Sequence, residues 1–161
     1  MSDIVEIDNK QVIEALYLYK KLSGDLKPIF TKFETYYQKF IGEKWELKGA
    51  PFGKKWKGLT PQYKTWKRKQ IGKASANLIL TGRLKRAATG GSEWISKKTG
   101  STFEFGVKVP YADAHQRGDP SKKLPQRPFF LMKNNKDLPL RAVGFLLNSI
   151  AEDYEKIKDK I

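Results

Sequence analysis

The side chain best suited to proton transfer near neutral pH is the chain's single histidine, His115, because imidazole titrates in that range. It stands between Asp113 and Asp119 in the sequence, so a histidine–aspartate pair for general acid–base catalysis is conceivable. A hydrolase of that type also needs a nucleophile, and the chain has neither a cysteine nor a serine in a G-x-S-x-G turn. A lone histidine more often forms structural hydrogen bonds. We therefore expect His115 to be structural.

A second pattern with chemical meaning is Glu46-x-Lys48, a fragment of the acid-x-lysine arrangement found in many metal-dependent nucleases. Those enzymes also need an upstream aspartate to share the metal, whereas residues 26–45 offer only Glu34 and Glu43. The scattered carboxylates likewise lack the ligand clustering of zinc or calcium sites. The sequence predicts no catalytic residue, no metal and no cofactor, and a nuclease is the weakest alternative.

Basic residues crowd the middle of the chain. The net charge is +15, and residues 44–86 hold thirteen Lys or Arg against one acid, Glu46, which leaves +12 in that segment. Such a density attracts nucleic acids, but also acidic protein surfaces and membrane headgroups. We predict a basic surface made of Lys54, Lys55, Lys57, Lys64, Lys67, Arg68, Lys69, Arg83, Lys85 and Arg86.

The length of 161 residues predicts a single domain over residues 1–161. The absence of cysteine excludes disulfides and cysteine-ligated metals. The N-terminal MSDIVEIDNK has acids where a secretory signal has basic residues. The longest apolar stretch, around AVGFLLNSI, is far shorter than the roughly 20 residues that span a bilayer. We expect a soluble protein with no membrane partner.

Helical periodicity marks both ends of the chain. N-terminal helices are predicted within residues 10–43: the first contains Val12, Leu16 and Tyr19, and the second follows Asp25 with an aromatic stripe. A C-terminal helix is predicted over residues 137–160, with apolar residues at alternating steps of three and four. The seam of this helix consists of Leu140, Val143, Leu147, Ile150, Tyr154, Ile157 and Ile161.

The middle of the chain predicts short elements. Residues 43–59 look like an ordered loop anchored by Trp45, Phe52 and Trp56. Thr60 before Pro61 predicts a capped basic helix, and Thr81 predicts the cap of another. The first of these helices is expected to turn its apolar residues inward, namely Tyr63, Trp66 and Ile71.

Alternating apolar residues predict a β-hairpin. SEWISKK and STFEFGVKVP are separated by the glycine-containing KTGS, which is typical of an antiparallel hairpin with one buried face. The predicted class is therefore α+β, with long N- and C-terminal helices packed with a small antiparallel β-sheet and short basic helices.

Three segments in a fixed order resemble one known family. LILTGRLKRAA at 78–88 resembles L-x-x-T-G-x-L-x-x-S-I, YADAHQRG at 111–118 resembles Y-A-x-x-H-Q-x-G, and LPQRPFF at 124–130 is similar to I-P-A-R-P-F-L. Together with the lead-in WKGLTPQYKTWKRKQIGK, they resemble the phage virion morphogenesis, or tail completion, family typified by the G protein of Mu-like phages. The likeness spans residues 56–131, and its motif positions are Thr81, Gly82, Leu84, Tyr111, His115, Gln116, Gly118, Arg127, Pro128 and Phe129.

The resemblance implies a non-enzymatic structural protein of the phage neck or tail end, acting in tail completion or head–tail joining as part of a homo-oligomeric ring. Its partners would be other neck or tail proteins, with possible non-specific contact to packaged DNA. Its location would be the virion, and the host cytoplasm during assembly. The residues themselves leave a free-standing nucleic-acid-binding protein open as an alternative, using the basic segment 44–86.

The motif residues also predict local structure. Tyr111 and His115 are four apart and would share one face of a short helix ended by Gly118. We expect the His115 side chain to form hydrogen bonds, and the Arg127 guanidinium to bind backbone carbonyls or a carboxylate. Phe129 and Phe130 would be buried beside Arg127. The segment would thereby fix the loop RGDPSKKLP against the hairpin.

Overall fold

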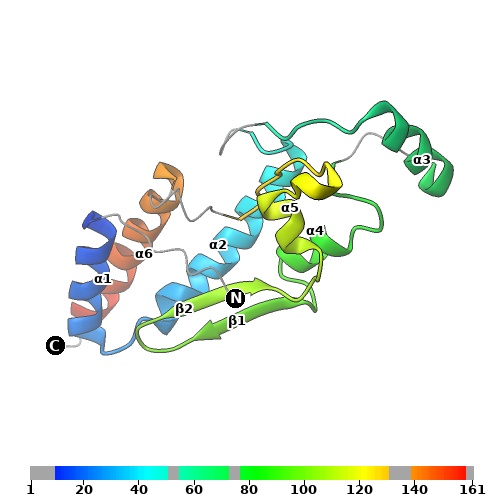
Figure 1. The fold of residues 1–161 in the computed structure, drawn as a ribbon. Coiled ribbons are helices and arrows are strands. Elements are labelled where there is room, and N and C mark those ends of the chain that lie inside the picture. The colour runs from blue at the N-terminus through cyan, green and yellow to red at the C-terminus, as the bar shows by residue number, and fades with distance from the viewer. Residues whose placement is uncertain (1–9, 51–54, 73–76, 131–138, 159–161) are drawn as a thin grey trace. The chain divides into compact units, whose positions relative to one another are not determined.

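A computed structural model describes residues 10–50, 55–72, 77–130 and 139–158. The fold is α+β, with long helices near both ends and a two-stranded antiparallel sheet, as predicted. Figure 1 shows the elements, which in chain order are α1 (Lys10–Ser23), α2 (Lys27–Glu46), α3 (Pro61–Ile71), α4 (Arg83–Ala88), β1 (Trp94–Lys98), β2 (Phe103–Val107), α5 (Ala112–Arg117), a 3₁₀ turn (Pro120–Lys122) and α6 (Leu140–Lys158).

The chain divides into two compact units, and each unit draws on segments far apart in sequence. The first unit contains α1, α2 as far as Tyr37, the turn end of the hairpin (Ser96–Phe105) and α6. The second unit contains the rest of α2, then α3 and α4, and the segment Gly106–Phe130 with α5. The prediction of one domain stays a prediction.

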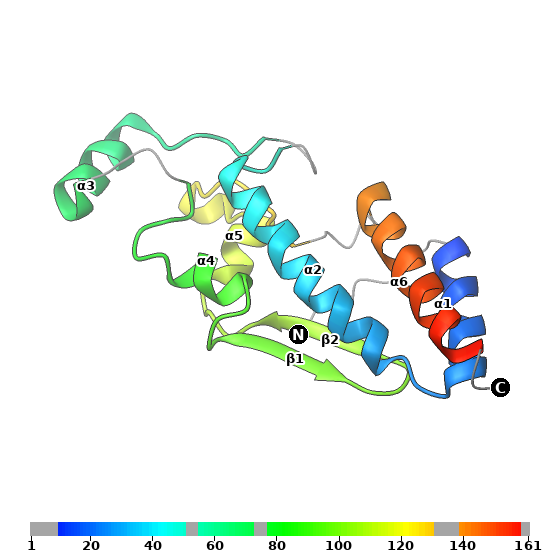
Figure 2. The same ribbon diagram turned by 180° about the vertical axis from the view of Figure 1, so that it is seen from behind.

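In the first unit, α1 and α6 lie side by side, as Figures 1 and 2 both show. Rings of α2 stack on the sheet and on α6: Phe30 on Phe103 at 5.8 Å between centroids, and Tyr36 on Phe145 at 4.3 Å. Burial of these large aromatic and aliphatic side chains is the main stabilising term. The buried apolar residues of this unit are Val12, Tyr19, Leu26, Ile29, Phe33, Tyr37, Ala142, Val143, Leu146 and Ile150.

The buried side of α6 differs from the apolar seam that the sequence predicts for the C-terminal helix. Val143 and Ile150 are buried, but Leu140 is 88% exposed and Tyr154 is exposed as well. The buried positions also include Ala142, Leu146 and Ser149, because the segments that pack on a helix, and not its apolar spacing alone, decide which side is covered. The side chain of Ile157 and all of Ile161 lie outside the described residues.

The short helices begin nearly where the sequence predicts. The Thr60 hydroxyl accepts a hydrogen bond from the Tyr63 N–H at 3.3 Å and caps α3, as predicted. The predicted cap of α4 is wrong by one residue, since Gly82 occupies the N-cap position with φ +78°. A positive φ suits glycine and strains threonine. Thr81 instead accepts from the Arg83 N–H at 3.4 Å.

The second unit has an aromatic core. Trp45 at the end of α2 contacts Trp56 edge-on at 5.4 Å and Phe129 at 5.2 Å. Trp45 and Trp56 are both buried, as predicted for anchors of the loop. The predicted loop over residues 43–59 begins too early, because α2 continues to Glu46 and includes Trp45; Phe52 lies outside the described residues. The remaining buried apolar residues of this unit are Phe40, Ile41, Leu84, Ala87, Ala88, Val109 and Ala112.

Candidate functional site

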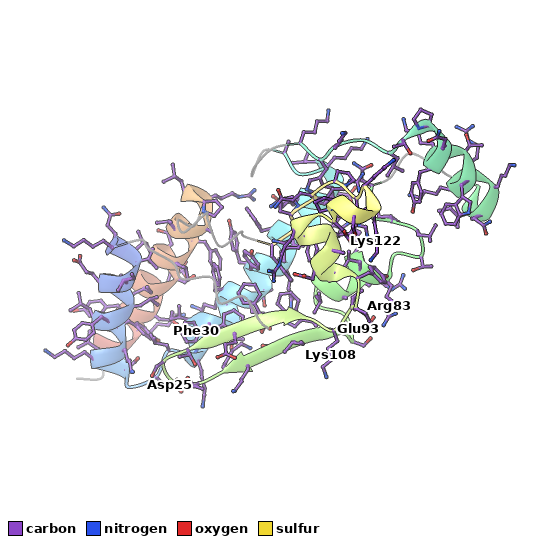
Figure 3. The ribbon with its side chains drawn as sticks, in the orientation of Figure 1. Asp25, Phe30, Arg83, Glu93, Lys108 and Lys122 are labelled. Atoms are coloured by element: carbon purple, nitrogen blue, oxygen red, sulfur yellow. The ribbon has the colours of Figure 1, made fainter. Side chains whose placement is uncertain are left out.

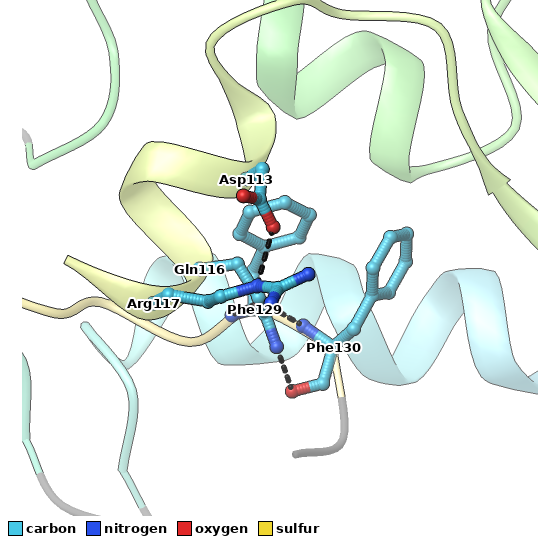
Figure 4. Close-up of polar contacts among 5 residues, drawn as sticks. All are labelled: Asp113, Gln116, Arg117, Phe129 and Phe130. Atoms are coloured by element: carbon cyan, nitrogen blue, oxygen red, sulfur yellow. Dashed lines mark hydrogen bonds and ion pairs between the residues drawn. The ribbon is translucent and has the colours of Figure 1, made fainter. Parts of the chain in front are cut away.

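The Gln116 side chain joins α5 to the segment after it. Its Oε1 accepts hydrogen bonds from the backbone N–H groups of Phe129 at 2.9 Å and Phe130 at 3.1 Å. Its Nε2 donates to the Phe130 carbonyl at 3.2 Å, as Figure 4 shows. One amide therefore hydrogen-bonds three backbone groups of this irregular segment. Arg117 beside it forms an ion pair with Asp113, with Nε and Oδ1 2.6 Å apart.

Arg127 ties three segments together. Its backbone N–H donates to the His115 carbonyl at 2.8 Å. Arg127 is only 4% exposed. Its guanidinium donates from Nε to the Lys57 carbonyl at 3.0 Å and from a terminal nitrogen to the Gly58 carbonyl at 3.3 Å. The prediction that Arg127 binds backbone carbonyls is confirmed. Burial lowers the pKa of Arg127, but a guanidinium stays charged at any physiological pH.

A tryptophan completes this network. The Trp56 Nε1–H donates to the Pro128 carbonyl at 3.1 Å, next to the Arg127 contacts with residues 57 and 58. Phe129 is buried, and the half-buried Phe130 lies edge-on to Trp94 at 6.1 Å. We call Trp56, Gln116, Arg127 and Pro128 the polar network. Its main tether leads to residues 56–58 and not, as predicted, to the hairpin.

Within the part of the chain that the structure describes, the His115 side chain does not form the hydrogen bonds that were predicted for it. Its ring is half-buried and lies edge-on to Tyr111 at 6.0 Å, so the shared helix face is confirmed. Its Nδ1 is buried and has no hydrogen-bond partner among the described residues. The hydrogen-bonding role belongs to the His115 backbone carbonyl and to the neighbouring Gln116. Burial, together with the charge of Arg127, lowers the pKa of His115 and so favours the neutral imidazole.

Gly118 closes α5 with a backbone that other residues adopt only under strain. Its φ of +81° is positive, as predicted, but its ψ of 163° is extended and not left-handed helical. A Cβ at this position would lie 2.9 Å from the backbone nitrogen of Gln126 and 3.1 Å from the Leu124 carbonyl oxygen. The loop is closed by reciprocal hydrogen bonds of 2.9 and 2.8 Å between the backbones of Asp119 and Leu124. A glycine is required here by both conformation and space.

The first motif lies apart from the polar network. Leu84 is buried in the core, and the Thr81 carbonyl accepts a hydrogen bond from the Arg86 guanidinium at 3.0 Å. Thr81 and Gly82 thus shape the start of α4. Arg83 extends from this helix to Glu93 and donates to both carboxylate oxygens, at 2.7 and 2.5 Å; Figure 3 shows the pair.

Most residues of the predicted basic surface are exposed, and one of them is buried. Lys67 is only 2% exposed, and burial lowers its pKa. Lys85 is half-buried and paired with Glu46, which ties up the carboxylate of the acid-x-lysine fragment. Lys54 lies outside the described residues. The exposed members are Lys55, Lys57, Lys64, Arg68, Lys69, Arg83 and Arg86.

The aromatic residues of α3 were predicted to face inward, and this is wrong. Tyr63 and Trp66 stack on each other with ring centroids 5.2 Å apart and planes 30° apart, and they are 41% and 44% exposed. Ile71 is exposed as well. Sequence reasoning missed this surface because aromatic residues at helical spacing usually mark a core. The available signal was the lack of any acid in a helix so rich in lysine.

No cluster of three His, Asp or Glu side chains that could hold a metal occurs within the described ranges. No helix in the part of the chain that the structure describes is long and apolar enough to cross a membrane. No protein-family model, curated protein or solved structure matches the chain.

Proposed function

We propose that this chain is a non-enzymatic structural protein of a phage particle, acting at the neck or tail end as a member of a homo-oligomeric ring. The proposal begins from the three ordered motifs. Its principal support is that Gln116 and Arg127, two polar motif residues with several hydrogen-bonding groups each, are engaged with backbone groups. Such residues serve to hold a loop region in shape, which is what an assembly surface requires.

The exposed side of α1 supports self-assembly. Four large apolar residues of this helix are exposed, while other residues of the same helix are buried. A helix that is apolar on more than one side gains stability when a second surface covers it. The exposed residues are Ile13, Tyr17, Leu18 and Leu22. A neighbouring copy in a ring would bury them.

Particles produced from the genome that carries this chain test the proposal. Deletion of its gene is expected to cause accumulation of heads and tails that are not joined, or of unfinished tails, visible by negative-stain electron microscopy. Mass spectrometry of purified wild-type particles is expected to detect the chain. Normal infectious particles from the deletion strain would contradict the proposal.

A variant of α1 tests the assembly surface separately. Complementation with Leu18→Glu is expected to fail, because a carboxylate at the centre of a buried contact is costly. Lys39→Glu, which introduces the same acid at an exposed site on α2, is the matched control and should restore particles. Equal complementation by both variants would remove α1 from the assembly surface.

A further inference from the structure

Helix α3 is firmly built yet presents nearly its whole surface to solvent. Every residue of α3 except Lys67 is exposed. Thr60 caps its first turn, and the N–H of Gly72, at φ +69°, donates to the Arg68 carbonyl at 2.8 Å and closes its last turn. The Arg127 guanidinium holds the carbonyls of Lys57 and Gly58 just before the helix. An isolated helix of this length is marginal in water, so these caps and this tether fix a helix that few internal contacts support.

The exposed surface of α3 contains a ready aromatic platform. The Tyr63 and Trp66 rings already stack on each other, so each has its rotation restricted before any ligand arrives. Lys69 follows Trp66 by three residues and shares its side of the helix. Lys64 and Arg68 are four residues apart and share another side.

The positive charge around α3 favours a negatively charged ligand. From residue 47 to residue 92 the chain contains no Asp or Glu, so no carboxylate of this segment neutralises the cations of the helix. Contact between two copies of α3 would bring like charges together at considerable cost. The surface therefore fits a polyanion.

We propose that α3 binds single-stranded nucleic acid without sequence preference, with an unpaired base stacked on the Tyr63–Trp66 platform and phosphates bound by Lys69 and the other cations of the helix. Aromatic side chains beside a basic track are the usual means of holding single strands, because every base has a stacking face. In a duplex the bases are already stacked on one another. A duplex would therefore contact the lysines of α3 through its phosphates and would not stack a base on Trp66. This inference does not depend on the role in a phage particle.

Fluorescence anisotropy with the full chain and a labelled oligothymidylate tests the inference. Trp66→Ala is expected to weaken binding by roughly 5- to 150-fold, the range set by loss of one base–aromatic stack. Trp66→Phe should retain most of the affinity. Tyr17→Ala on α1, which removes another exposed aromatic ring, is the matched control and should leave binding unchanged.

Salt dependence tests the phosphate contacts independently. Lys69→Gln is expected to reduce the slope of log K against log salt by about 0.7, the value for one phosphate contact on a single strand. Lys39→Gln on α2 should not change the slope. Circular dichroism of each variant verifies that the helices remain folded, which we expect because the substituted side chains are exposed.

Four outcomes would overturn the inference. The first is no binding to the oligonucleotide at low salt. The second is binding that is unaffected by Trp66→Ala, which would leave a purely electrostatic attraction. The third is tighter binding to a duplex of the same length than to the single strand. The fourth is binding to polyglutamate as tight as to the oligonucleotide, which would assign α3 to acidic protein surfaces.

Discussion

Lys44 is the charged group whose burial has the clearest measurable consequence. The residue is 5% exposed near the end of α2, and no described residue forms an ion pair with it. Burial lowers the pKa of Lys44 from 10.5 to about 8, since a low-dielectric surrounding penalises the ammonium. Each pKa unit corresponds to about 1.4 kcal/mol. Keeping Lys44 charged in the folded protein therefore costs about 3 kcal/mol of the free energy of unfolding at pH 7.

The sign of the pH dependence follows from this lowered pKa. Below pH 8, Lys44 is protonated in both states and the folded state bears the full cost. Between pH 8 and 10.5, the folded state releases the proton first, so the contribution of Lys44 to stability improves as pH rises. Above 10.5 the lysine is neutral in both states and the cost is gone.

Lys44→Met removes the charge and keeps an unbranched apolar side chain. Urea denaturation at pH 7 is expected to show a variant more stable than wild type by up to about 3 kcal/mol. The difference should shrink as pH rises from 8 to 10.5. Lys39→Met, at an exposed position of the same helix, is the control and should change stability by less than about 0.5 kcal/mol.

The comparison of the two variants also isolates Lys44 from other groups that titrate at high pH. The pKa of Tyr19 is raised by burial and by the nearby Asp153, but Tyr19 is unchanged in every protein compared. A Lys44→Met protein that is no more stable than wild type at pH 7, or a difference that does not depend on pH, would refute the reasoning.

Three further substitutions test the polar network, the α5 loop and the first unit. Arg127→Lys should lower the free energy of unfolding by about 2 kcal/mol, because lysine cannot reproduce the forked donation to two carbonyls; unchanged urea denaturation would contradict this. Gly118→Ala should cost more than about 1 kcal/mol through its positive φ and its close approach to Gln126, and a thermal midpoint equal to wild type would argue against it. Burial opposes ionisation of Asp153, but hydrogen bonds and charges from Lys32 and Lys156 outweigh it and lower the pKa of Asp153. The ionised carboxylate thus stabilises the fold above the ordinary pKa of aspartate, and this contribution is lost as pH falls below it. Asp153→Asn should therefore lose about 1 kcal/mol at pH 7 and show a weaker decline of stability under acid; parallel acid-unfolding curves would count against the ion pair.

Local features of this chain could be predicted because they depend on near neighbours in sequence. The Thr60 cap is one example, since the hydroxyl and the N–H it accepts from are three residues apart. The hairpin is another, because alternation of Phe103 and Phe105 with polar residues requires only the period of a strand. The long helices at the two ends follow from apolar spacing in the same way, which is why the α+β class was predictable.

Contacts between distant segments could not be predicted. The carbonyls that hold Arg127 belong to residues about 70 positions earlier, and no pattern in the sequence pairs them. We expected the His115 side chain to form hydrogen bonds, but it is the side chain of the adjacent Gln116 that binds the next segment. Adjacent residues on one short helix differ only in direction, and packing decides which of them reaches the next segment.

Helix α3 shows most clearly which features the sequence determines and which the tertiary structure decides. The sequence by itself determined where this helix begins and ends, because a threonine–proline start and a glycine stop act through local backbone geometry. It also determined the charge, which is a matter of composition. Only the tertiary structure decided which side is covered: Lys67 is buried, and Tyr63 and Trp66 are exposed. Side-chain burial depends on which distant segment packs against a helix, and a lysine stem can fill apolar space as a ring can.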